Sequence, residues 1–191
     1  MVPSCTVEFN KLMNELETRE LESPNGIMCA REYAQLLTIY LYQDKICNAK
    51  FLWKRIPSDI KAVHEELGRI WLVAQRMWQR DWPAVHVALN TEWSDDVKEI
   101  MVSLKCKVRE RVMKLISKAY SLLNLTSMAT ISGLSLDEAR QAAIDMRWNI
   151  IDGTIVQPCK YIDEVHNNVN EFAMTEEKLH KFTEFVSFLE N

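Results

Sequence analysis

The side chains that could bind a metal or transfer protons in this 191-residue chain are its four histidines and five cysteines. The histidines are dispersed, at His64, His86, His166 and His180. They form neither a His-x-His nor a His-Glu-x-x-His motif, so no predicted helix presents two imidazoles to one metal ion. His64-Glu65-Glu66 brings three possible ligands together, but neighbouring positions on a helix point in different directions. The sequence predicts no metal site and no cofactor, and solvated helical positions for His64 and His180.

The cysteines do not suggest a shared site either. They lie at Cys5, Cys29, Cys47, Cys106 and Cys159. An odd number with wide spacing and no Cys-x-x-Cys pair is typical of reduced thiols inside the cell. We expect Cys47 and Cys106 to be small core residues. A thiol enzyme stays an alternative, which requires one cysteine with a lowered pKa. No glycine-rich run precedes a lysine, so no phosphate loop is predicted, and we expect a protein that is not an enzyme.

The composition favours a helical protein that acts through contacts with other proteins. The chain is 48% hydrophobic and 26% charged, with only four glycines and five prolines. Its net charge of −4 argues against a nucleic-acid surface. No apolar run approaches the roughly 20 residues that cross a bilayer, and the first residues lack the pattern of a secretory signal. We expect a cytoplasmic and nuclear protein that binds no membrane, no nucleic acid and no small-molecule ligand.

Apolar residues recur every three or four positions through the first two thirds of the chain, which predicts a series of amphipathic helices. They extend from about residue 6 to 18, 31 to 42, 45 to 56, 58 to 79 and 95 to 116. Asp81 is the predicted cap of a further short helix. Short turns between helices of this kind suit a helical repeat of the TPR or HEAT type, although no clean sequence period is present. We assign residues 1–125 to a helical-repeat subdomain.

Two groups of side chains on these helices are candidates for partner contacts. Four of the six tryptophans lie between Trp53 and Trp82. Helical spacing predicts that Trp53, Trp71 and Trp78 are mainly core anchors, with a partner surface as the alternative for one ring. The second group is a basic cluster, predicted to be a solvated helix face, with contact to an acidic partner as the alternative. It comprises Lys105, Lys107, Arg109, Arg111 and Lys114.

The pattern changes after about residue 125. Residues 126–158 predict two short helices and a β-hairpin, the element order of a winged helix. Ser135 and Glu138 fit a capping box at the start of the second helix. Asp152-Gly153 between β-branched residues is the strongest short-range hairpin signal. The fold class is therefore mostly α: a helical repeat, a winged-helix subdomain and a C-terminal helix.

A winged helix suggests DNA binding, but the charges on its second helix oppose it. The end of this helix that would face the base edges carries Asp137 and Glu138. Only Arg140 and Arg147 supply positive charge. A nucleic-acid-binding protein is thus the alternative, and the favoured interpretation is a packing module whose hairpin edge pairs with another chain by strand addition.

The C-terminal part separates into a polar linker, 159–174, and a helix, 175–191. The helix carries one wide apolar stripe. Its five side chains would contribute roughly 10 kcal/mol as an upper figure if fully buried. A helix of this length is marginal alone, so we expect the stripe to be covered by another surface. The stripe comprises Leu179, Phe182, Phe185, Val186 and Leu189.

Several segments together resemble a known family. They are residues 51–57 (Phe-Leu-Trp-Lys-Arg-Ile-Pro), the run from Trp71 to Asp81, residues 133–135, Trp148 with residues 152–154, and the ending 185–191. Over nearly the whole chain the sequence is similar to the PCI-domain family formed by the eighth, smallest subunit of the COP-nine signalosome. More distant relatives are the small PCI subunit of the proteasome regulatory particle and subunit k of translation initiation factor three, which stand as alternative assignments.

The resemblance implies a PCI architecture and a non-catalytic scaffold in the complex that removes a ubiquitin-like modifier from cullins. In that family the winged helices align edge to edge and the C-terminal helices gather in a bundle. Carried over, the wing edge would contact other PCI subunits, with subunit three as nearest neighbour, and the 175–191 helix would enter the bundle. Animal members have a longer, proline-rich connector than 159–174, which here contains no proline. The implied wing-edge residues are Ile150, Ile151, Thr154, Ile155 and Val156.

Overall fold

The computed structural model describes residues 3–159 together with Leu179, His180 and Thr183. Contacts divide the chain into two units, Met1–Cys159 and Lys160–Asn191. The first unit contains helices and a small sheet, so the predicted mostly helical fold is confirmed. Within the second unit, the three described residues are helical and exposed, and the Thr183 hydroxyl donates to the Leu179 carbonyl oxygen at 2.9 Å.

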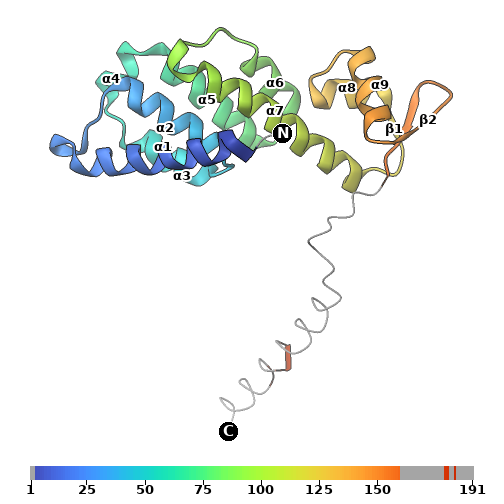
Figure 1. The fold of residues 1–191 in the computed structure, drawn as a ribbon, viewed down its shortest axis with the longest axis horizontal. Helices are drawn as coiled ribbons and strands as arrows, with labels where there is room; N and C mark the ends of the chain where they lie inside the picture. Colours follow the sequence, from blue (N-terminus) through green and yellow to red (C-terminus); the bar gives the residue numbers. More distant parts are fainter. Residues whose placement is uncertain (1–2, 160–178, 181–182, 184–191) are drawn as a thin grey trace. The chain divides into compact units, whose positions relative to one another are not determined.

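Seven α-helices and a 3-10 turn precede the first strand of the described chain. They are α1 (Pro3–Glu22), η1 (Pro24–Gly26), α2 (Ala30–Tyr42), α3 (Ile46–Arg55), α4 (Ser58–Val63), α5 (Glu65–Gln79), α6 (Trp82–Leu89) and α7 (Asp95–Ala119). The remaining elements are β1 (Leu123–Asn124), α8 (Leu125–Ser132), α9 (Leu136–Asp145), β2 (Asn149–Ile151) and β3 (Ile155–Gln157). In Figure 1, α7 extends from the group of earlier helices to the part formed by α8, α9 and the strands.

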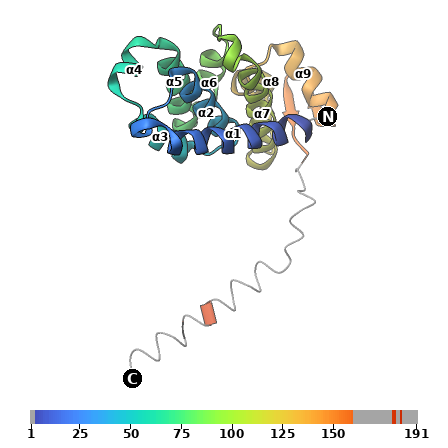
Figure 2. The same cartoon turned by 60° about the vertical axis from the view of Figure 1, so that its left-hand side comes forward.

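Helix α2 is at the centre of the helical part because it is apolar nearly all round. Nine of its residues are buried, and Leu36, Leu37 and Ile39 are fully inaccessible. An α-helix without a polar face must be covered on every side. Accordingly α2 packs against α1, α3, α5 and α7 (Figure 2).

The long helix expected from residue 58 to 79 is interrupted at His64. This residue has φ −111° and ψ 89°, which ends α4, and α5 starts at the next position. The prediction of one continuous helix was wrong because α4 buries none of its residues, and Val63 is 75% exposed. With only Ile60 half-buried against the core, α4 has little packing to keep it in register with α5.

The three candidate anchor tryptophans differ in burial. The rings of Trp53 and Trp71 are half-buried and stacked, with centroids 5.2 Å apart and planes 4° from parallel. Trp78 is 53% exposed, so the prediction of a core position was wrong for this ring. The buried face of α5 contains Ile70, Ala74 and Met77. Positions 71 and 78 lie one residue further round the helix, at the flank of that face.

The strands form one antiparallel sheet in the order β1-β3-β2. Ile150 of β2 and Leu123 of β1 both pair with Val156. Asp152 and Gly153 have positive φ values of 49° and 69°, as in the central pair of a type I′ turn, and with Thr154 they form the loop between the paired residues Ile151 and Ile155. The predicted hairpin is present, whereas β1 was not predicted. The finer assignment to helical repeats and a winged helix stays a prediction.

Candidate interaction surfaces

The sheet has two outer strands, β1 and β2, and β2 offers the longer open edge. Since β3 is the central strand, the backbone of Ile155 and Val156 faces partner strands on both sides. The side chain of Val156 is fully buried, and that of Ile150 is half-buried. Thr154 lies in the turn, where its carbonyl oxygen accepts a hydrogen bond from the Leu125 N–H at 2.8 Å. An added strand would therefore pair with an outer strand rather than with β3, and β2 is the longer of the two.

Of the five predicted wing-edge residues, some lie on the outer strand β2 and the others do not. Ile150 and Ile151 lie on the open strand, with Ile151 37% exposed. Thr154 and Ile155 are exposed but are not part of the open edge. Asn149, also on β2, was missed by the sequence analysis, which took the hairpin as a whole. Their roles as interface residues stay predictions.

Of the predicted C-terminal stripe, the structure describes Leu179 alone, and this side chain is 61% exposed. Phe182, Phe185, Val186 and Leu189 lie outside the described residues. The proposal that this stripe is an interface therefore depends on the sequence pattern.

A buried polar junction links α6, α7 and the turn between α8 and α9. His86 of α6 is 3% exposed, and its ring lies against Gly133, whose φ is +63°. A guanidinium N–H of Arg109 on α7 donates to the Gly133 carbonyl oxygen at 3.1 Å. Among the described residues, neither imidazole nitrogen of His86 nor Nε of Arg109 has a partner with hydrogen-bonding geometry. The junction therefore depends on close packing and tolerates little change in volume.

Burial lowers the pKa of His86 below its usual value of 6.5, and the Arg109 and Lys105 charges lower it further, while the nearby Ile131 backbone offsets only part of this. The folded protein thus favours the neutral imidazole, and the unfolded chain binds the proton more readily. Stability is unaffected above about pH 6.5 and falls as pH decreases toward the lowered pKa, by at most about 1.4 kcal/mol per pH unit.

We expect His86→Gln to reduce the change of the unfolding free energy with pH between about pH 6.5 and 5, as measured by urea unfolding. His64→Gln, which replaces an exposed imidazole, should leave this pH dependence unchanged. The carboxyl groups of Glu32 and Glu138 affect the free energy of unfolding at lower pH than His86 does. Hydrogen bonds, chiefly from the Cys29 side chain and the Ser135 backbone N–H respectively, lower their pKa values from 4.5. The stability that they supply is lost only as pH falls below that value. Equal slopes for the two histidine variants would contradict the assignment to His86.

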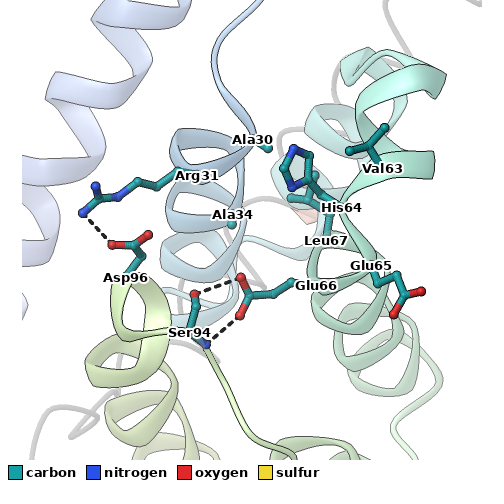
Figure 3. Close-up of a pocket in the computed structure, with 10 residues that line it drawn as sticks. All are labelled: Ala30, Arg31, Ala34, Val63, His64, Glu65, Glu66, Leu67, Ser94 and Asp96. Atoms are coloured by element: carbon teal, nitrogen blue, oxygen red, sulfur yellow. Dashed lines mark hydrogen bonds and ion pairs between the residues drawn. The ribbon is translucent and has the colours of Figure 1, made fainter.

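A polar pocket of about 500 Å³ lies where the N-terminal ends of α2, α5 and α7 meet. Figure 3 shows Glu66 directed toward Ser94, and Arg31 toward Asp96. Glu66 accepts from the Ser94 N–H at 2.8 Å and from its hydroxyl at 2.9 Å. Arg31 and Asp96 form an ion pair at 2.5 Å. These charges are engaged with one another, and carboxylates at helix N-termini are stabilising, so we assign them to holding the three helices together.

The basic cluster on α7 also makes contacts within the chain. Lys105 Nζ donates to Asn90 Oδ1 at 2.6 Å, and Lys107 Nζ lies 4.0 Å from the centroid of the Tyr42 ring. Arg111 pairs with Asp44 at 2.9 Å. With the bond from Arg109 to Gly133, at least four of the five cations hold neighbouring elements. This supports neither a freely solvated face nor a dedicated acidic partner for the cluster.

The free cysteines of the described chain, Cys29, Cys47, Cys106 and Cys159, are exposed. The prediction that Cys47 and Cys106 are core residues was wrong, because α3 directs Ala49 and Leu52 inward, and α7 directs Leu104 and Val108. Residues 3–159, with the three described positions beyond, contain no group of three or more potential metal ligands. Nor does any described helix combine the length and apolar character needed to cross a membrane.

Comparison with known proteins identifies the family. A family model described as CSN8/PSMD8/EIF3K matches residues 30–167. The chain is 36% identical over 187 residues to a Xenopus laevis protein named COP9 signalosome complex subunit 8, covering 97% of this chain and 94% of that one. The protein of the same name from Danio rerio is 36% identical over 95% of this chain and 94% of its own length. The Drosophila melanogaster protein is 31% identical over 96% and 98%. This chain belongs to the CSN8/PSMD8/EIF3K family.

Proposed function

We propose that this chain is a subunit of a COP9 signalosome. The observation that carries the proposal is the 36% identity over 97% of the chain to a protein named as subunit 8 of that complex. The alignment spans almost the full length of both chains, so the likeness extends beyond one shared subdomain. A signalosome assignment therefore takes precedence over the proteasome and initiation-factor members of the same family.

Within the complex we assign the chain a scaffolding and regulatory role in deneddylation, the removal of a ubiquitin-like modifier from cullins. The β2 edge, with Ile151 exposed beside it, offers backbone groups that a strand of another subunit can pair. The 175–191 stripe offers an apolar helix face to a bundle. We propose subunit three as the neighbour at the sheet edge, and the cytoplasm and nucleus as the sites of action.

The test is to purify the tagged full-length chain from cells of its own source and identify its partners by mass spectrometry. We expect the complete set of signalosome subunits in equal amounts, together with cullin deneddylation activity in the eluate. Recovery of proteasome-lid or initiation-factor subunits instead would reject the proposal, and so would recovery of the chain alone.

A photo-crosslinking residue at position 151 tests the neighbour. We expect it to capture subunit three, whereas the same residue at Leu136, which is 51% exposed on α9, serves as the matched control and gives little capture. A different subunit captured from position 151 would leave the complex assignment intact and reject subunit three at the sheet edge.

A further inference from the structure

A second apolar surface lies on α3 and α5, which belong to the group of helices on the other side of α7 from the sheet in Figure 1. Its groove has a volume of about 240 Å³. For comparison, an engineered protein cavity of about 150 Å³ accommodates benzene. The groove therefore has room for one large side chain. We call it the aromatic groove, and its walls include Ile46, Lys50, Trp71, Ala74, Gln75 and Trp78.

The exposed ring in this groove is poorly explained by folding alone. Trp78 is 53% exposed, although a large apolar ring gains most by full burial. Phe51, the residue after Lys50 on α3, is 57% exposed. Tryptophan is among the residue types that most often carry binding energy at protein interfaces. The half-covered Trp78 ring is therefore the natural anchor for an apolar side chain of a partner.

The charges around the aromatic groove define what this partner carries. Its lining includes Lys50 and no carboxylate. Helix α3 contains no aspartate or glutamate, and α5 contains none after Glu66, although the chain as a whole has a net charge of −4. Lys50 Nζ is held 4.9 Å from the centroid of the Trp78 ring. A cation fixed beside an apolar slot complements a carboxylate next to an apolar residue.

The aromatic rings are poorly placed for stacking on nucleic-acid bases, which requires free ring faces. Trp53 and Trp71 are stacked on each other. Lys61 Nζ lies 4.8 Å above the Trp53 ring, and Lys50 lies over Trp78. A run of stacked bases would need a free face on successive rings, whereas a single apolar side chain needs only the space that remains between Trp71 and Trp78, so a protein segment is favoured over a single-stranded nucleic acid.

We propose that the aromatic groove docks an acidic amphipathic segment of another protein, with a large apolar side chain between Trp71 and Trp78 and a carboxylate paired with Lys50. A helix of the partner that lies in the groove, against α3 and α5, can present both groups together. Residues three or four positions apart lie on the same face of a helix. This docking surface goes beyond the proposed function, because it uses neither the sheet edge nor the terminal helix.

The probe is a fluorescein-labelled helical peptide of Glu, Ala and Leu with a single apolar stripe, titrated against the full-length chain by anisotropy. A matched peptide with Lys in place of Glu, and an oligo-dT strand, are titrated in parallel. We expect the acidic peptide to bind at least about tenfold more tightly than the basic one, and its binding to weaken as salt rises from about 50 to 500 mM.

Trp78→Ala and Lys50→Glu should each weaken acidic-peptide binding by about tenfold. The matched controls are Val102→Ala and Lys98→Glu, which alter an exposed valine and a lysine in a different surface pocket of about 450 Å³. These should change binding less than twofold. Because Lys50 is exposed, Lys50→Glu remains informative if Trp78→Ala lowers stability, and thermal unfolding followed by circular dichroism identifies that case.

Three results would overturn the proposal. The first is acidic-peptide binding that neither Trp78→Ala nor Lys50→Glu reduces. The second is binding of the oligo-dT strand or the basic peptide that Trp78→Ala abolishes. The third is a concentration-dependent dimer that dissociates on Trp78→Ala, because the occupant would then be a second copy of this chain. None of these results bears on membership of the signalosome, which the purification tests separately.

Discussion

Gly133→Ala is expected to lower the free energy of unfolding by about 3 kcal/mol or more, a severe effect for one methyl group. Gly133 has a φ of +63°, and an added Cβ would lie 2.3 Å from Cγ of His86. The left-handed backbone costs a residue with a side chain about 1–2 kcal/mol. Overpacking a closed site adds about 1–3 kcal/mol, and His86 is only 3% exposed, so its ring has little room to move. Urea unfolding measures the loss.

Gly153→Ala is the matched control, because it separates backbone strain from packing. Gly153 has a φ of +69°, but an added Cβ there meets nothing within 4 Å. We expect a loss of about 1–2 kcal/mol, from the backbone alone. Adding His86→Gly to Gly133→Ala should recover part of the stability, since it removes both the ring and the His86 Cβ, which lies 2.6 Å from the added methyl group. Equal losses for the two glycine variants would show that the junction is less tightly packed than the distances indicate.

Deleting residues 175–191 is expected to remove most incorporation into the complex while leaving the Met1–Cys159 unit folded. The deleted stripe would contribute roughly 10 kcal/mol as an upper figure, of which the cost of association leaves only a part as binding free energy. Thermal unfolding should change by no more than a few degrees. Co-purification with tagged partner subunits measures incorporation.

The control for this deletion keeps the helix and alters only its predicted polar face. Glu177→Ala combined with Glu184→Ala changes two positions opposite the stripe at about 100° per residue, so it leaves the apolar stripe unchanged and should retain nearly normal incorporation. The truncated chain recovered with its full set of partners at normal yield would refute the role of the terminal helix.

Features encoded by neighbouring residues were predictable from the sequence. The capping box is present, since the Glu138 N–H donates to Ser135 Oγ at 3.3 Å and the Ser135 N–H donates to a Glu138 carboxylate oxygen at 2.9 Å. Asp81 caps α6 by accepting from the Ala84 N–H at 3.3 Å. Such pairs lie three residues apart, so their geometry is settled by the local helix.

Features that depend on distant contacts were not predictable. Strand β1 has two residues, too few to show alternation, and it exists because Val156 pairs with Leu123. The exposure of Cys106, by contrast, was predictable, because this residue lies two positions from both Leu104 and Val108 and hence on the opposite face of α7. The two candidate surfaces also differ in whether they depend on neighbouring residues or on distant contacts. The apolar stripe is a local pattern, whereas the strand order decides that β1 and β2, and not β3, are the outer strands.

The order β1-β3-β2 also has a consequence for the newly synthesised chain. Leu123 and Asn124 leave the ribosome before α8 and α9, but the strand that pairs with them is made only afterwards. During translation, β1 must therefore wait unpaired until Ile155 and Val156 emerge. A recombinant fragment that begins at residue 126 would lack β1. Its β3 would then become an edge strand with unpaired backbone groups, to which other chains could pair. Dissection of this region is best begun upstream of Leu123.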